Sequence, residues 1–150
     1  MNPRPARGAV LAFDFGEKRI GVAVGEIELG IPHALTVIAA EDNRSRFAAI
    51  AALIAEWRPV RLVVGVASHA DGAVHGTGRL AQRFGQRLTG RFGIATDFVD
   101  ERLTSHAAEA ALREGGVRAG RRGALLDAAA AAEILRTWFT GTQRISRGDC

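Results

Sequence analysis

The sequence predicts an α/β fold in which a mixed five-stranded sheet carries helices on both faces. Two apolar segments joined by a tight turn come first, and apolar segments then alternate with amphipathic ones at helical spacing. The length of 150 residues suits one hydrophobic core. Because no repeat or low-complexity linker interrupts it, we expect residues 1–150 to form a single domain, with 1–8 and 141–150 flexible.

The first three strands are expected at residues 10–15, 20–25 and 34–38. The first is an apolar run that ends at Gly16, and a short turn through Arg19 leads into the second run. Two strands joined by so short a turn pair as an antiparallel hairpin. Because the third run follows closely, the chain is expected to begin with a meander.

Helices and strands alternate in the rest of the chain. A helix is expected at 43–57, where Phe47, Ile50 and Trp57 recur at helical spacing before Pro59. Strands at 61–66 and 94–100 flank a helix at 77–92, and helices at 104–114 and 125–139 follow. A hairpin meander followed by βαβ crossovers gives a mixed sheet with helices on its faces.

The composition favours a nucleic-acid partner and excludes a membrane span. The net charge is +4, and arginine supplies every basic residue except Lys18. A basic surface attracts polyanions, whereas no apolar run approaches the roughly 20 residues that cross a bilayer. Cys150 is the only cysteine, so no intramolecular disulfide can form. These features fit a protein of the reducing cytoplasm.

Asp14 occupies an unusual position for a carboxylate. It lies inside the apolar run 10–15, which reads as a central, buried strand. Burying an unpaired carboxylate costs several kcal/mol. Asp14 therefore needs a partner arginine, a backbone cap or a bound cation.

Two further positions carry candidate acids. Asp100 and Glu101 end the fifth strand, where open α/β sheets bind ligands. Because adjacent strand residues point to opposite faces, only one of them is expected to reach a site, and an ordinary strand exit is the alternative. Asp127 precedes the apolar Ile134 by almost two helical turns, which favours the inward face over a solvated one.

Converging carboxylates repel one another, and a hard divalent cation compensates for this repulsion. Mg²⁺ is predicted, with Mn²⁺ as the alternative, because both prefer oxygen ligands. Two such ions can activate water and stabilise the leaving oxygen of a phosphodiester. Zinc is not expected, because the histidines lack zinc-ligand spacing; they are His33, His69, His75 and His106.

Two groups of basic residues are candidate phosphate contacts. In the helix at 77–92, arginines recur every four residues beside an apolar row of Leu80, Phe84 and Leu88. We expect this basic row to hold a nucleic-acid backbone, chiefly through Arg83 and Arg87, and a solvated face is the alternative. In the hairpin turn, Lys18 and Arg19 follow Asp14 closely and are expected to contact a phosphate, unless the turn is merely solvated.

Several motifs together resemble the YqgF family. They are Leu11-Ala12-Phe13-Asp14-Phe15-Gly16-Glu17-Lys18-Arg19-Ile20-Gly21-Val22-Ala23, Val63-Val64-Gly65, Asp71-Gly72, Val99-Asp100-Glu101-Arg102-Leu103-Thr104-Ser105 and Asp127-Ala128-Ala129-Ala130-Ala131-Ala132-Glu133-Ile134-Leu135. The similarity covers residues 9–140. The resemblance implies a ribonuclease-H-like fold and a cytoplasmic nuclease that matures the 5′ end of pre-16S ribosomal RNA.

By motif position, the resemblance implies Asp14, Glu101 and Asp127 as the acidic triad, with Asp100 as a substitute for Glu101. Arg102 of the same motif is a further substrate-binding candidate. The expected partners are a ribosomal RNA precursor, ribosomal particles or branched DNA, without a membrane.

The alternative functions are a Holliday-junction resolvase-like DNA endonuclease and a non-catalytic RNA-binding module. An ATPase of related fold would need a second, duplicated domain.

Overall fold

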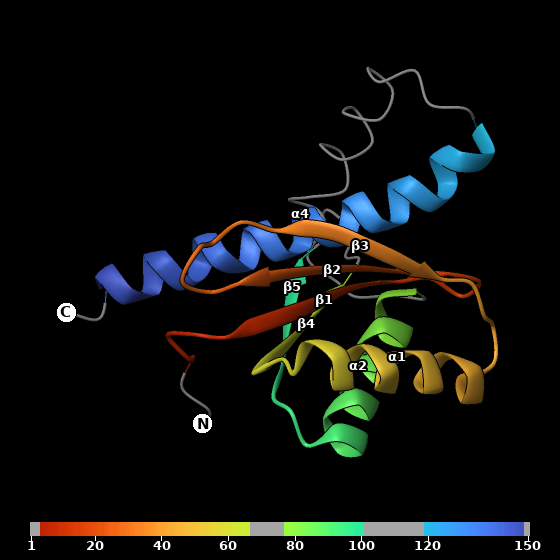
Figure 1. Ribbon diagram of the computed structural model, residues 1–150, viewed down its shortest axis with the longest axis horizontal. Coiled ribbons are helices and arrows are strands. Elements are labelled where there is room, and N and C mark those ends of the chain that lie inside the picture. The colour runs from red at the N-terminus through yellow and green to blue at the C-terminus, as the bar shows by residue number, and fades with distance from the viewer. Residues whose placement is uncertain (1–3, 67–76, 101–118, 149–150) are drawn as a thin grey trace.

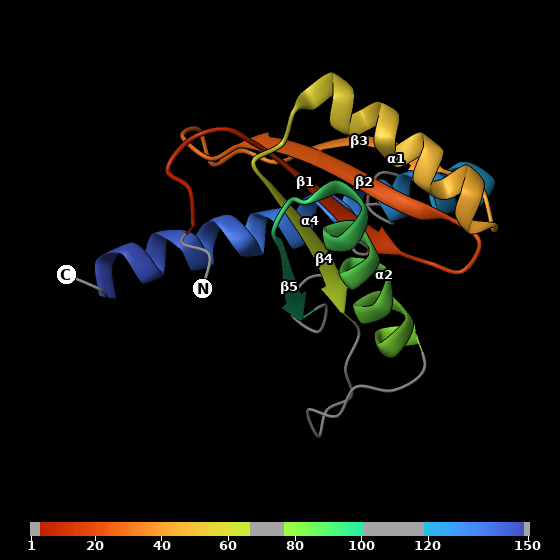
Figure 2. The same ribbon diagram turned by 90° about the horizontal axis from the view of Figure 1, so that it is seen from below.

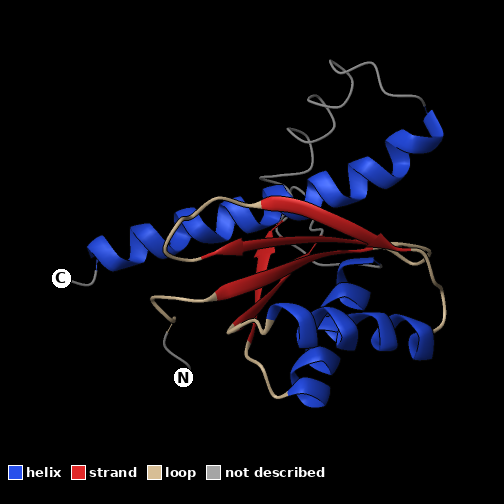
Figure 3. Cartoon of the chain, in the orientation of Figure 1, coloured by secondary structure: helices blue, strands red, loops and turns tan. Residues whose placement is uncertain are grey.

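The computed structural model describes residues 4–66, 77–100 and 119–148, which form a five-stranded sheet with a helix layer on each face (Figures 1 and 3). The strands lie in the order β3-β2-β1-β4-β5. β1 pairs antiparallel with β2, and β2 with β3, whereas β1–β4 and β4–β5 are parallel. In chain order the elements are β1 (Ala9–Phe15), β2 (Ile20–Glu26), β3 (His33–Ile38), α1 (Asn43–Trp57), β4 (Arg61–Val66), α2 (Thr77–Phe92), β5 (Thr96–Asp100) and α4 (Ala119–Gly148).

The two faces of the sheet carry separate hydrophobic cores, because side chains alternate along each strand. Leu11 and Phe13 of β1 point to the face covered by α1 and α2, where Phe84 meets Phe13 edge to face with ring centroids 5.8 Å apart. Val10 and Ala12 point to the other face, which α4 covers (Figures 1 and 2). The central strands are therefore apolar on both sides.

α1 is delimited by a cap at each end. The side chain of Asp42 accepts a hydrogen bond of 2.8 Å from the backbone N–H of Ser45, which satisfies one of the free donors of the first turn. At the other end Arg58 adopts a left-handed conformation with φ of 47°, and its N–H donates to Ile54. Pro59 then prevents the helix from continuing.

A polar cluster fixes α4 against the amino-terminal end of β4. Asp97 accepts hydrogen bonds from Trp138 Nε1 at 2.7 Å and from Arg61 Nη1 at 3.1 Å. Arg4 stacks over the Trp138 ring, with Cζ 5.1 Å from the centroid. The segment before β1, which was expected to be flexible, thus contacts α4 through Arg4.

The predicted order of elements is confirmed for the described residues. The helices predicted at 43–57 and 77–92 and the strand at 61–66 have the predicted bounds. The other strands differ by one or two residues at an end. The helix predicted at 104–114 lies outside the described residues.

The last helix was predicted too short. Instead of 125–139 it spans Ala119–Gly148, so most of the predicted flexible tail is helical. No proline occurs in this segment, and each glycine costs a helix only about 1 kcal/mol relative to alanine, which the added hydrogen bonds of a growing helix offset. Among the described residues, no helix combines the length and the apolar character needed to cross a membrane.

Candidate active site

Asp14 lies near the carboxyl end of β1, on the face that α4 covers. Strand alternation gives Asp14 the same orientation as Val10 and Ala12, which belong to the core under α4. Asp14 is half-buried, and its partner across the hairpin is Gly21. A carboxylate therefore stands at the end of the α4-side core.

Asp127 meets the same glycine from the helix side. A Cβ atom added at Gly21 would overlap the carbonyl group of Asp127 and lie 2.9 Å from the amide nitrogen of Ala128. The backbone of α4 therefore packs directly on β2 at this point, which only glycine permits. Gly21 thus has Asp14 as its strand neighbour and Asp127 as its helix neighbour, although the two acids are far apart in sequence.

The hairpin turn places an arginine against Asp127. Arg19 Nε donates a 2.7 Å hydrogen bond to Asp127 Oδ2, in an ion pair whose Arg19 side chain is half exposed. Lys18, the preceding residue, is exposed. Of the two turn residues predicted to act near Asp14, Arg19 is the one that the structure brings to Asp127.

Asp100 and Asp14 lie on opposite faces of the sheet. Asp100 shares strand parity with Phe98 and Thr96, both of which meet α2: Thr96 Oγ1 is 2.9 Å from Thr89 Oγ1. Val99, by contrast, belongs to the core under α4. Asp100 is thus oriented away from the face of Asp14. Glu101 and Arg102 lie outside the described residues.

The described acids fit a cation site only in part. Within residues 4–66, 77–100 and 119–148, no group of three histidine, cysteine, aspartate or glutamate side chains converges as a metal site would require. Asp14 and Asp127 supply hard oxygen donors, which suit Mg²⁺ or Mn²⁺. The pairing of Arg19 with Asp127 indicates that this carboxylate is compensated by positive charge. Asp14 and Asp127 thus supply two of the oxygen ligands that such a cation needs, and its further ligands must come from other residues.

The basic row of α2 is exposed, as predicted. Phe84 and Leu88 are buried, Leu80 is half-buried, and all four arginines are exposed; they are Arg79, Arg83, Arg87 and Arg91. Arg91 stacks on Phe47, with Cζ 4.3 Å from the ring centroid. Arg83 and Arg87 form no ion pair within the described part of the chain. α2 covers the face of the sheet opposite α4.

Two residues that shape the candidate site, Gly21 and Arg46, were not identified from the sequence. Gly21 carried a usable signal, because a glycine inside an apolar strand often marks a close backbone approach. Arg46 is almost fully buried, at 3% exposure, and binds carbonyl groups of the hairpin turn. Its signal was weaker: Arg46 precedes Ile50 by four residues and so shares the buried stripe of α1.

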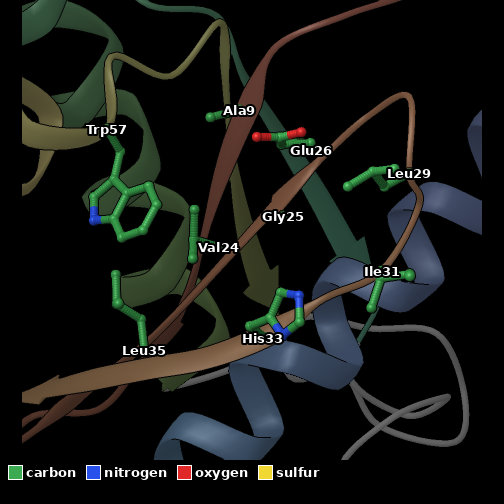
Figure 4. Close-up of a pocket in the computed structure, with 9 residues that line it drawn as sticks. All are labelled: Ala9, Val24, Gly25, Glu26, Leu29, Ile31, His33, Leu35 and Trp57. Atoms are coloured by element: carbon green, nitrogen blue, oxygen red, sulfur yellow. The ribbon is translucent and has the colours of Figure 1, made fainter.

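A pocket of about 270 Å³ lies at the other end of the hairpin (Figure 4). Trp57, Val24 and Leu35 line one side, and Leu29 and Ile31 line the other. The β1–β2 pair Ala9 and Glu26 borders the pocket, five residues along the strands from Asp14 and Gly21, or roughly 17 Å. This apolar pocket is therefore separate from the acids.

Two solved structures with a similar fold are of Holliday-junction proteins. The chain superposes on "T. thermophilus RuvC in complex with Holliday junction substrate" with a TM-score of 0.56 and 17% identity, covering 91% of this chain and 96% of that one. The yeast mitochondrial Holliday junction resolvase Ydc2 gives a TM-score of 0.54 at 14% identity, covering 92% and 80%. These similarities establish the fold: the sheet and its helices form a RuvC-like, ribonuclease-H-like domain, as the resemblance implied.

The sequence comparisons give the family. A relative from Dechloromonas aromatica, named "Putative pre-16S rRNA nuclease", is 56% identical over 92% of this chain and 94% of its own length. A relative of the same name from Chromobacterium violaceum is 54% identical over 86% and 95%. The model of the RuvX family, described as Holliday junction resolvase, matches residues 8–141. The family and its relatives are thus named for nuclease activity, and this chain belongs to the RuvX family.

Proposed function

We propose that this protein is a metal-dependent nuclease that cleaves a phosphodiester bond in a ribosomal RNA precursor, within the 5′ region of pre-16S RNA. The observation that carries the proposal is that Asp14 of β1 and Asp127 of α4 both lie next to Gly21, on one face of a ribonuclease-H-like sheet. The names of the relatives support the substrate. A substrate of this kind implies action in the cytoplasm, with RNA or a ribosomal particle as partner.

Asp14, Glu101 and Asp127 are the proposed ligands of Mg²⁺, with Mn²⁺ as a substitute. Glu101 is preferred to Asp100 because Asp100 has the strand parity of Phe98, on the face turned away from Asp14. A bound divalent ion would supply Lewis-acid stabilisation of phosphate oxygens and lower the pKa of a water molecule. Asp14 of β1 and Asp127 of α4 would hold that ion together with Glu101, which follows β5 in the sequence.

The neighbouring cations are the proposed substrate contacts. Arg19, which is hydrogen-bonded to Asp127, is placed to bind a phosphate at that carboxylate, and Lys18 and Arg102 are the other proposed substrate contacts. An arginine fork suits phosphate because it donates two parallel hydrogen bonds. Arg83 and Arg87 would hold the nucleic acid farther from the cleaved bond.

The first test compares substrates and metals. The purified protein is incubated with end-labelled pre-16S RNA and with a four-way DNA junction, in Mg²⁺, Mn²⁺, Ca²⁺ or excess EDTA. We expect cleavage of the RNA in Mg²⁺ or Mn²⁺, inhibition by Ca²⁺, which accepts looser geometry, and no cleavage in EDTA. Undiminished cleavage in EDTA would exclude the metal mechanism.

Incubation with the four-way DNA junction tests the second candidate function. The family description and the fold favour a resolvase-like endonuclease, which would cut the junction symmetrically in Mg²⁺. Cleavage of the junction with no cleavage of pre-16S RNA would replace the proposed substrate. Binding of RNA without cleavage in any metal would indicate a non-catalytic RNA-binding module.

The basic row of α2 is tested by the salt dependence of RNA binding. Arg83→Glu with Arg87→Glu should weaken binding to all sequences alike. The slope of log affinity against log salt should also fall by about 1.4, because each phosphate contact on a single strand contributes about 0.7. Fluorescence anisotropy over a salt series measures both quantities.

The matched control for this variant changes the same net charge elsewhere. Arg58 and Arg136 are also exposed but lie at the end of α1 and on α4, outside the basic row of α2. Arg58→Glu with Arg136→Glu should lower the affinity only through the long-range charge and leave the slope nearly unchanged. Equal slopes for the two double variants would remove the basic row from the RNA path.

A further inference from the structure

Arg46 connects three segments of the chain from within the core of the α1 face. Its Nη2 donates to the carbonyl oxygen of Gly16 at 2.7 Å and also to that of Glu17, and its Nε donates to that of Ala40. Its Cζ lies 5.3 Å from the centroid of the Phe15 ring. A buried guanidinium is costly unless its donors are used, and here they are used on backbone carbonyls.

The carbonyls that Arg46 binds belong to the turn that carries Arg19. Gly16 and Glu17 follow the last residue of β1, and the turn is tight: a Cβ at Gly16 would lie 2.5 Å from the carbonyl oxygen of Arg19. Arg46 holds the turn from the α1 side of the sheet. The Arg19 side chain leaves the same turn and reaches Asp127 of α4 on the other side.

Nearby carboxylates favour the charged form of the buried Arg46 guanidinium. Burial lowers the pKa of the Arg46 guanidinium, and the carboxylates of Glu41, Asp42 and Glu17 oppose that shift. The planar guanidinium donates from two of its nitrogens in fixed directions, so it can bridge Ala40 to the turn. A lysine ammonium has no such fork.

We propose that Arg46 is a positioning residue of the candidate active site, which fixes the hairpin turn so that Arg19 lies against Asp127, where it can also meet a substrate phosphate. This inference rests on the proposed function for the substrate contact, but the coupling of Arg46 to Arg19 is independent of it. Arg46 touches neither acid and acts through the turn.

Arg61 provides a matched control. It is the other buried charged residue of the described chain, at 4% exposure against 3% for Arg46. It pairs with Asp97, on the α4 side near Trp138, and lies beside Val10, at the opposite end of β1 from the hairpin turn. Arg61→Gln and Arg46→Gln therefore make the same chemical change at equal burial, in different surroundings.

The first experiment measures stability without any activity. Denaturant unfolding is followed for the wild type, Arg46→Gln, Arg19→Ala and the double variant, and then for the same cycle with Arg61→Gln. We expect the destabilisations by Arg46→Gln and Arg19→Ala to be non-additive, by about two- to fivefold in the unfolding equilibrium constant. The cycle with Arg61→Gln should be additive. Additivity in the Arg46 cycle would overturn the proposal.

The second experiment measures RNA affinity by anisotropy at a temperature where all variants are folded. Arg46→Gln should weaken binding about threefold in the wild-type background and have no effect in the Arg19→Ala background. Arg61→Gln should leave the affinity unchanged in both. Equal losses from Arg46→Gln and Arg61→Gln would reduce Arg46 to a general structural role.

Arg46→Lys covers the case in which Arg46→Gln fails to fold. It keeps the charge but not the planar fork, so it should fold and still lose most of the Arg19-dependent affinity. Full affinity and full coupling to Arg19 in this variant would overturn the proposal. If the wild-type protein binds no RNA, the proposed function fails, while the unfolding cycle still decides the role of Arg46.

Discussion

The Asp14→Asn and Asp127→Asn variants are expected to cleave at least about 100-fold more slowly than the wild-type protein. Replacing a residue that only supports a metal ligand costs about 10- to 100-fold, and removing a ligand should cost more. An amide keeps the shape of the carboxylate but has no charge to hold a divalent cation. The measurement is the single-turnover rate on end-labelled pre-16S RNA in saturating Mg²⁺.

The loss must be separated from unfolding. Asp127→Asn removes the negative charge of the ion pair with Arg19, whose side chain is half exposed. The free energy of unfolding should therefore change by no more than about 1 kcal/mol. Asp42→Asn is the matched control, because Asp42 is an exposed N-cap and asparagine caps helices equally well. Normal cleavage by Asp14→Asn, in folded protein, would contradict the proposed site.

The same assay distinguishes Asp100, the last residue of β5, from Glu101, which follows it in the sequence. Asp100→Asn should retain activity because Asp100 has the orientation of Phe98, on the α2 side of the sheet, whereas Glu101→Gln should lose it. The opposite result would transfer the ligand role to Asp100 and would require the Asp100 side chain to point to the α4 side of the sheet. Isothermal titration with Mn²⁺ gives an independent reading, because loss of a ligand should lower metal affinity.

Sequence patterns predicted the parts of this fold that local chemistry determines. Pro59 and the spacing of Phe47 and Ile50 were sufficient to delimit α1, and the short turn after Asp14 was sufficient for the β1–β2 hairpin. The end of α4 was missed because no local stop signal marks it: glycines weaken a helix without ending it. Helix ends that depend on propagation are therefore less predictable than those fixed by caps.

The candidate site was predictable as a set of residue types but not as an arrangement. An aspartate in an apolar strand indicated Asp14, and the helical spacing to Ile134 indicated the inward face for Asp127. Alternation predicted that only one of Asp100 and Glu101 faces the site, and the packing of Phe98 on α2 reveals which face Asp100 takes. The Arg46 contacts join segments distant in sequence, and no local pattern specifies such partners.

Gly21→Ala is expected to have the second large effect, because Gly21 sets the distance between β2 and α4. A Cβ at this position would overlap the carbonyl group of Asp127, and these backbone atoms cannot rotate away as a side chain could. α4 must shift, which should destabilise the fold by about 1 to 3 kcal/mol. The shift also moves Asp127 relative to Asp14, and misplacement by about 1 Å can cost roughly 100-fold in rate.

The comparison for Gly21→Ala is Gly90→Ala. Gly90 lies in α2, is exposed, and a Cβ there would meet nothing within 4 Å. Alanine favours a helix over glycine by about 0.5 to 1 kcal/mol, so Gly90→Ala should be slightly more stable than the wild type and equally active. Thermal unfolding and single-turnover cleavage are measured on both variants. Wild-type stability and rate in Gly21→Ala would mean that α4 does not rest on β2 at this glycine. The placement of Asp14 and Asp127 on either side of Gly21 would then lose its structural basis.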